Sequence, residues 1–163
     1  RLESQKNFSY VIESLNGSDI QIDIYGEGSL KNYLLKLAVE NNVKVNFFGT
    51  VPYSKLQQIC KDYTIFISSS KYEGNPKTIL EAMASKCLVL ASDIPNNLEI
   101  IKNNENGFLF NFNDDLSKMI NYIFENQSEM KKITDESFRT VCKTNSISKI
   151  AELQINSYRK LVT

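Results

Sequence analysis

Two glutamates stand eight positions apart in the stretch SSSKYEGNPKTILEAMAS, residues 68–85. Glu73 lies beside Gly74 in a segment with loop character, and Glu81 lies on the helix that the following residues predict. An ionised carboxylate only accepts hydrogen bonds, and its lone pairs can hold two hydroxyl groups at once. The pair therefore indicates a ligand with several hydroxyl groups, although Glu81 can equally be read as a surface charge on an amphipathic helix.

The Asn75-Pro76 dipeptide between the glutamates marks the expected start of that helix. Asn favours the N-cap and Pro the first helical position, so we expect the helix to begin at Pro76. The free N–H groups and the dipole at a helix start suit an anion, phosphate above all, and Lys77 would suit a bound anion there. The simpler interpretation is a capping Asn and a solvated Lys. With the two glutamates, however, the pattern favours a ligand that carries both hydroxyls and phosphate, such as a nucleotide sugar.

Strand and helix patterns alternate around this stretch. Strands are expected at 20–26, 44–49, 63–70, 87–92 and 106–111, and helices at 7–15, 30–42, 53–62, 76–85, 96–102, 116–126, 128–142 and 146–161. The alternation predicts an α/β protein with a Rossmann-like three-layer α/β/α arrangement around a parallel sheet. The runs 63–70 and 87–92 are apolar enough to be buried strands. Ligands of such sheets bind beyond the carboxyl ends of the strands, where the turns after Tyr25, Phe48 and Ser68 are expected.

Composition excludes several kinds of site. A chain of 163 residues suggests one domain with a real core. Its 19 basic and 19 acidic residues balance, which gives no electrostatic case for nucleic acid as a partner. Histidine is absent, so His-based triads and His metal sites have no candidates. Three separated cysteines without a CxxC indicate reduced thiols in a cytosolic protein, with Cys87 as a small core residue.

The run EGNPKTILEAMA resembles the E-x7-E motif of retaining glycosyltransferases of the GT-B fold, in the glycosyl transferases group 1 or GT4 family. The flanking segments are similar in the same order: RLESQKNF at the start, then residues 22–56, 88–101 and 106–114. The resemblance covers about residues 1–115. It implies that residues 1–163 form the nucleotide-sugar (donor) binding domain, with C-terminal helices at about 116–162, and that an N-terminal acceptor domain is absent from this chain.

The resemblance also implies a role for each matching position. Glu73 would contact hydroxyls of the transferred sugar and Glu81 the ribose, while Arg1 and Lys6 would clamp the pyrophosphate and stabilise the departing diphosphate. Glu73, Arg1 and Lys6 are thus the candidate catalytic residues. The other implied donor-binding positions are Gly26, Gly74, Asn75, Thr78 and Ile79 through their backbones, and Gly49 and Val51 in the loop that would receive the base. Val51 can equally pack on the core, and many relatives carry a bulkier apolar residue at the position of Asn75, which leaves the sugar open.

By the same resemblance we expect transfer of a hexose from a UDP- or GDP-linked sugar to an acceptor glycan or lipid-linked sugar, in surface polysaccharide or glycolipid synthesis. We expect no metal and no other cofactor, because the sequence has no DxD and no His. The chain alone should be inactive without its acceptor domain. A cytoplasmic location is expected, and peripheral contact with the inner face of the membrane through the missing domain stays open.

Two other classes of protein stay open on the residues alone. A nucleotide-sugar epimerase of similar fold would need its own acid and base carboxylates and usually a His, which this chain lacks. A non-catalytic Rossmann-like nucleotide-binding or regulatory module would lose no activity when Glu73 and Glu81 are changed. A dinucleotide dehydrogenase is disfavoured, because Lys31 stands where the third glycine of GxGxxG belongs.

Overall fold

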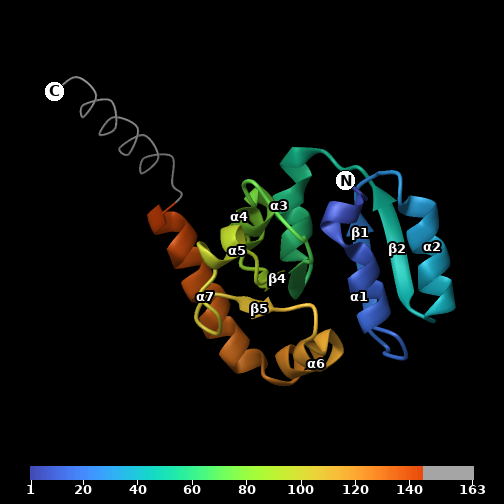
Figure 1. The fold of residues 1–163 in the computed structure, drawn as a ribbon. Coiled ribbons are helices and arrows are strands. Elements are labelled where there is room, and N and C mark those ends of the chain that lie inside the picture. The colour runs from blue at the N-terminus through green and yellow to red at the C-terminus, as the bar shows by residue number, and fades with distance from the viewer. Residues whose placement is uncertain (145–163) are drawn as a thin grey trace.

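The computed structural model describes residues 1–144 of the chain (Figure 1). It consists of a 3-10 turn η1 (Ser4–Lys6), helices α1 (Phe8–Ser14), α2 (Lys31–Glu40), α3 (Tyr53–Lys61), α4 (Lys77–Ala84), α5 (Pro95–Leu98), α6 (Leu116–Glu125) and α7 (Gln127–Thr144), and strands β1 (Gln21–Tyr25), β2 (Lys44–Gly49), β3 (Ile65–Ser68), β4 (Leu88–Ser92) and β5 (Phe108–Phe110). The helix expected at 146–161 lies outside the described residues. None of the described helices is long and apolar enough to cross a membrane.

Every strand pair in the described part of the chain is parallel, which confirms the predicted α/β class. The strands form two sheets, β1-β2 and β3-β4-β5, because no ladder of hydrogen bonds joins β1 to β3 among residues 1–144. Side chains connect the two sheets instead. The hydroxyl of Tyr63, just before β3, donates to Asp23 Oδ2 on β1 at 2.5 Å and lies 2.8 Å from the hydroxyl of Tyr25.

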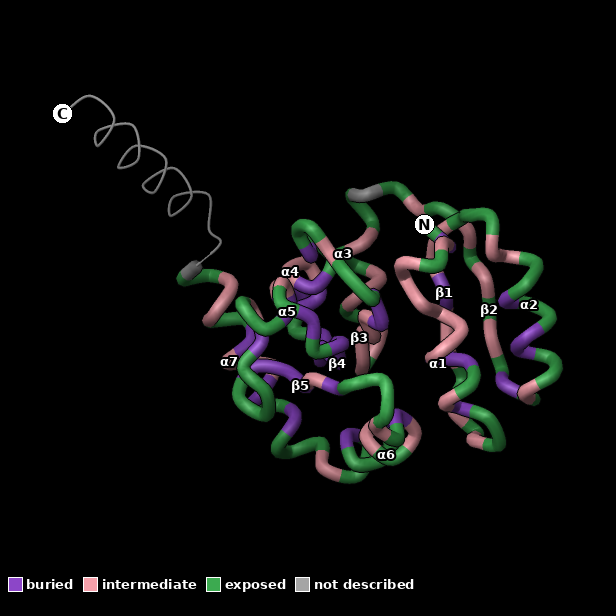
Figure 2. Tube along the Cα trace, in the orientation of Figure 1, coloured by how far each residue is buried: buried purple, intermediate pink, exposed green. Residues whose placement is uncertain are grey.

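Side chains of strand β4 pack into a different hydrophobic cluster on each face of its sheet. Leu88 and Leu90 point into a core cluster that also contains buried residues of α1, α2 and α6, whereas Val89 and Ala91 point into a second cluster with α4. Because successive side chains of a strand face opposite sides, this division places helices on both faces of the sheet. All five residues of β4 are buried, as expected for the central strand of its sheet (Figure 2).

One expectation about the strands is wrong. The apolar run at 63–70 predicts a buried strand, but all four residues of β3 are only half-buried. The reason is its place in the sheet: β3 pairs with β4 on one side and forms the edge on the other. Cys87, by contrast, is buried as predicted, and burial together with the nearby Cys60 raises its thiol pKa to about 12.

Candidate functional site

Glu73 lies in the loop between β3 and α4, at the carboxyl end of β3. Its Oε1 atom accepts a hydrogen bond from the Ser70 hydroxyl at 2.6 Å and forms an ion pair with Lys6 Nζ at 2.5 Å. Within residues 1–144, Oε2 has no hydrogen-bond partner. The side chain is only 12% exposed, so the carboxylate is held by one oxygen while the other remains able to accept hydrogen bonds.

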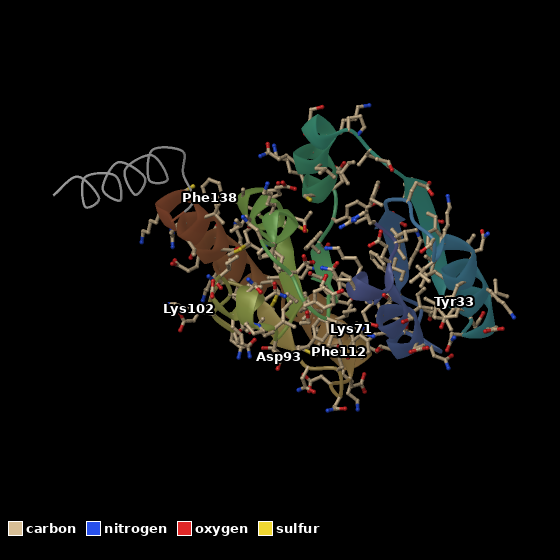
Figure 3. The ribbon with its side chains drawn as sticks, turned by 45° about the horizontal axis from the view of Figure 1, so that its top comes forward. Tyr33, Lys71, Asp93, Lys102, Phe112 and Phe138 are labelled. Carbon is tan, nitrogen blue, oxygen red and sulfur yellow. The ribbon has the colours of Figure 1, made fainter. Side chains whose placement is uncertain are left out.

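The loop that carries Glu73 is docked onto η1, which explains how Lys6 reaches a residue 67 positions away. The Ser69 hydroxyl donates to the carbonyl of Lys6 at 2.7 Å. The Lys71 N–H donates to the carbonyl of Gln5 at 2.9 Å, and the Gln5 amide donates back to the carbonyl of Tyr72 at 2.8 Å. Figure 3 labels Lys71 in this loop, near the segment that precedes α1. The 3-10 turn therefore forms one wall of the site.

The start of α4 differs from the prediction. The helix begins at Lys77, and the Asn75 side chain makes no capping hydrogen bond. Pro76 instead has φ −79° and ψ 61°, and the Lys77 N–H donates to the Asn75 carbonyl at 2.9 Å. These are the angles and the hydrogen bond of an inverse γ-turn, so the carbonyl of Asn75 satisfies a helix-start donor that its side chain was expected to satisfy.

This turn leaves backbone donors exposed at the helix start. Within the described part of the chain, the N–H groups of Gly74, Asn75 and Thr78 find no acceptor. The fourth predicted donor, Ile79, is different: its N–H is bonded to the Pro76 carbonyl at 3.0 Å and the residue is fully buried. Three of the four expected backbone donors are therefore available to an anion beside Glu73.

Gly26, which follows β1, and Gly49, the last residue of β2, meet at the carboxyl ends of these two strands. The Gly26 N–H donates to the Gly49 carbonyl at 2.7 Å, and both glycines have positive φ. The backbone of Arg1 lies against Gly26, 3.5 Å from the position a Cβ would take. The Arg1 guanidinium is exposed and pairs with Glu3 at 3.7 Å, so the structure does not bring it to Lys6 as a ready-made clamp.

Glu81, on α4, and Val51, in the loop before α3, are the two remaining predicted donor-binding residues. Glu81 is half-buried, and its carboxylate makes no hydrogen bond or ion pair among residues 1–144. It does lie near α3: burial first, and the Glu81 charge second, raise the pKa of the Cys60 thiol. Val51 is half-buried in the loop before α3, which decides neither of its two proposed roles.

Sequence reasoning missed the importance of Gly28. A Cβ there would lie 2.4 Å from the carbonyl oxygen and 2.5 Å from the nitrogen of Leu2, so only glycine allows residues 1 and 2 to lie against the loop after β1. It also missed Ser70, which was read only as the boundary of a strand. A signal for Gly28 was visible in the sequence, since a second glycine two positions after Gly26 is typical of a close backbone approach.

A separate hollow of about 620 Å³ lies at the opposite edge of the β1–β2 sheet. It is lined by residues 16–21, before β1, and by Ser117, Asn121 and Phe124 of α6. None of the predicted site residues lines it. The described residues also contain no group of three or more acidic or cysteine side chains able to hold a metal ion.

Comparison with known proteins places this geometry in a family. The profile of the family described as Glycosyl transferases group 1 matches residues 1–140. The poly(ribitol-phosphate) alpha-N-acetylglucosaminyltransferase of Staphylococcus aureus is 33% identical over 108 residues, 64% of this chain and 22% of that protein. The GtfA subunit of a UDP-N-acetylglucosamine–peptide N-acetylglucosaminyltransferase from Streptococcus agalactiae is 30% identical over 115 residues, 67% of this chain and 22% of that protein.

A solved structure agrees with these relatives. A variant of S. aureus TarM, in complex with fondaparinux, alpha-GlcNAc-glycerol and UDP, superposes with a TM-score of 0.85 at 26% identity, over 96% of this chain and 33% of that one. The chain thus spans about a fifth to a third of the length of these relatives. The α/β fold described above is that of a GT-B glycosyltransferase domain. The chain belongs to the glycosyl transferases group 1 family.

Proposed function

We propose that this chain is the donor-binding domain of a retaining, GT4-type glycosyltransferase that moves a sugar from a UDP-linked donor to an acceptor hydroxyl. One observation carries the proposal: among residues 1–144, the Glu73 carboxylate is anchored through Oε1 and free at Oε2, directly before the unpaired N–H groups of Gly74, Asn75 and Thr78. A hydroxyl-binding acceptor next to anion-binding donors matches the order of groups in a nucleotide sugar.

Each part of the donor then has a partner. Glu73 Oε2 accepts two hydroxyl hydrogens of the transferred sugar, and the free backbone N–H groups receive the diphosphate. Lys6 donates one of its three ammonium hydrogens to Glu73, which leaves two for phosphate oxygens. Arg1 adds a second cation after leaving Glu3, an exposed pair that is weak in water. Glu81 accepts from the ribose, and the loop of Gly49 and Val51 receives the base.

The chemistry follows from these positions. The bond between the anomeric carbon and the diphosphate oxygen breaks, and positive charge builds on the sugar ring while negative charge builds on the diphosphate. Lys6, Arg1 and the start of α4 stabilise that negative charge. The acceptor hydroxyl attacks from the face that the diphosphate leaves and passes its proton to the departing phosphate oxygen. Glu73 is not assigned as a nucleophile, because its bonds to Ser70 and Lys6 hold it for the sugar hydroxyls. No metal is required in this scheme.

The names of the relatives support a uridine nucleotide, since one names UDP-N-acetylglucosamine and a solved relative holds UDP. The acceptor, a glycan or a lipid-linked sugar, would bind a further domain of the same protein, in surface polysaccharide or glycolipid synthesis at the cytoplasmic side of the membrane. The expectation that the chain alone turns over no donor belongs to this proposal.

Calorimetric titration with UDP, GDP and ADP tests the proposal. We expect saturable binding of UDP, weakened about tenfold by Glu81→Ala, since one hydrogen bond to a charged group contributes about 1.5 kcal/mol or more. The matched control is Glu13→Ala, which removes an exposed carboxylate from α1 and should leave the affinity unchanged. The proposal fails if the protein that carries this chain binds none of the three nucleotides and hydrolyses no nucleotide sugar.

A further inference from the structure

A chain of buried polar groups lies beneath the Glu73 loop. The Ser92 hydroxyl, at the end of β4, donates to the carbonyl of Ser70 at 2.6 Å. The side-chain amide of Asn97, on α5, donates to the carbonyl of Ser92 at 2.8 Å. These three residues, here called the Ser70–Asn97 relay, are 2%, 0% and 0% exposed in the order Ser70, Ser92, Asn97. The relay ties the ends of two neighbouring strands to a helix of the next loop.

Helix α5 also holds the other side of the Glu73 turn. The Asn96 side-chain amide donates to the carbonyl of Gly74 at 3.0 Å. Two consecutive asparagines thus reach the same loop by different routes: Asn97 through Ser92 to Ser70, and Asn96 directly to Gly74. The segment from Ser70 to Gly74 is therefore fastened at both ends, with Glu73 between the two attachments.

The relay determines what Ser70 can do to Glu73. Lys6 approaches Oε1 with an ammonium on a flexible four-carbon stem, which supplies charge but little directional control. Ser70 has a short side chain on a backbone that Ser92 holds, so its hydroxyl fixes the direction of its 2.6 Å bond to Oε1. Asn97 Oδ1 has no partner in the described chain, so the relay is held by its donors: the Ser92 hydroxyl and the Asn97 amide each donate to a backbone carbonyl. A hydrogen bond to a charged acceptor, such as that of Ser70 to Glu73, is stronger than one between neutral groups. A carboxylate fixed at Oε1 presents Oε2 in one orientation.

We propose that Ser70, Ser92, Asn96 and Asn97 are positioning residues, which hold Glu73 so that its free oxygen meets the hydroxyls of the donor sugar. None of the four needs to touch the substrate, and each acts through the loop or the carboxylate. The inference rests on the proposed function, since it assigns a purpose to the orientation of Glu73 within the donor site.

Kinetics of Ser70→Ala in the whole protein that carries this chain tests the inference, with hydrolysis of UDP-N-acetylglucosamine as the reaction. We expect kcat to fall roughly tenfold, because the lost hydrogen bond to a charged group orients the sugar contact. Affinity for UDP should stay within about twofold, because the proposed contacts of the Glu73 carboxylate are with hydroxyls of the transferred sugar, which UDP lacks. The matched control is Ser137→Ala, a serine of α7 that is 1% exposed and whose hydroxyl has no partner in the described chain. It should leave both quantities unchanged.

A double-mutant cycle separates positioning from a general loss of structure. In a Glu73→Ala background there is no carboxylate for Ser70 to orient, so adding Ser70→Ala should change kcat by less than about twofold. If Ser70→Ala does not fold, Asn96→Ala replaces it, with the same expected split between kcat and UDP affinity. The inference is overturned if a folded Ser70→Ala variant has the same kcat as an active wild-type protein, or if the fold-losses in kcat that the two changes cause simply multiply in the double variant. If the wild type neither binds UDP nor hydrolyses any UDP-sugar, the proposed function itself fails and the inference falls with it.

Discussion

Replacing Gly28 with alanine should displace the first two residues from the donor site. Residues 1 and 2 lie across the loop after β1, where the Leu2 N–H donates to the Glu27 carbonyl at 2.9 Å and the Leu2 carbonyl accepts from Leu30 at 3.1 Å. A Cβ on Gly28 would lie 2.4 to 2.7 Å from three backbone atoms of Leu2. Backbone cannot rotate away as a side-chain end can, so the whole segment has to move.

The loss of stability can be worked from these contacts. Two backbone hydrogen bonds contribute about 1 kcal/mol each. Leu2 is fully buried, and partial exposure of its side chain costs about 1 kcal/mol more. The sum, about 3 kcal/mol, is at the upper end of the usual cost of overpacking, about 1–3 kcal/mol. With a urea slope of about 2 kcal/mol per M, the midpoint of unfolding should fall by about 1.5 M.

Urea unfolding followed by circular dichroism measures this shift. Gly74→Ala is the matched control, because a Cβ at Gly74 meets nothing within 4 Å and its φ is not in the positive region. Its midpoint should stay within about 0.5 M of the wild type, since a compatible Gly→Ala change is worth less than about 1 kcal/mol. Equal midpoints for Gly28→Ala and the wild type would refute the close approach of Leu2 to this loop.

Three further outcomes are expected. Ser137→Ala should raise the free energy of unfolding by about 1 kcal/mol in thermal melts, because it removes a buried hydroxyl that has no partner in the described chain; a loss of stability would contradict this. Tyr63→Phe should destabilise by about 1 kcal/mol at neutral pH. Burial tends to raise the pKa of Asp23, but hydrogen bonds, that of Tyr63 foremost, lower it overall. A carboxyl group whose pKa is lowered by folding stabilises the folded state at pH values above its unfolded pKa, about 3.9, and this stabilisation is lost as the pH falls through the folded pKa. The stability deficit of Tyr63→Phe should therefore shrink in urea titrations below about pH 4 and not above it. In thiol labelling followed by mass spectrometry, the exposed Cys142 should react well before Cys87, whose pKa is about 12; the reverse order would be inconsistent with the described core.

Much of the fold was predictable because its signals are local. The strand at 44–49 was predicted with its exact bounds, and the apolar run at 87–92 was correctly predicted as buried. The half-exposure of β3 was not predictable, because an edge strand and a central strand have the same internal pattern, and only the pairing of distant segments distinguishes them. The absence of a hydrogen-bond ladder between β1 and β3 within residues 1–144 was not predictable for the same reason.

The candidate site was predictable as a set of residues more than as a geometry. The resemblance assigned Lys6 to phosphate and Glu73 to sugar, but nothing in a spacing of 67 residues indicates that the two are in contact. The start of α4 was misplaced because the carbonyl of Asn75 competes with its side chain for the first donor, and Pro76 favours the turn. The sequence predicted Asn96 and Asn97 only as the first residues of a helix at 96–102, since hydrogen bonds across loops leave no periodic trace.

The central claim is that a nucleoside diphosphate binds between Glu73 and the start of α4. Two-dimensional NMR of the ¹⁵N-labelled chain, titrated with UDP, tests it most directly, because the free N–H groups of that turn are themselves the reporters. The account predicts that the amide signals of Gly74, Asn75 and Thr78 move together and saturate, while the signals of residues 16–21, in the separate hollow, stay in place. Saturable shifts confined to residues 16–21, with Gly74, Asn75 and Thr78 unmoved, would contradict it.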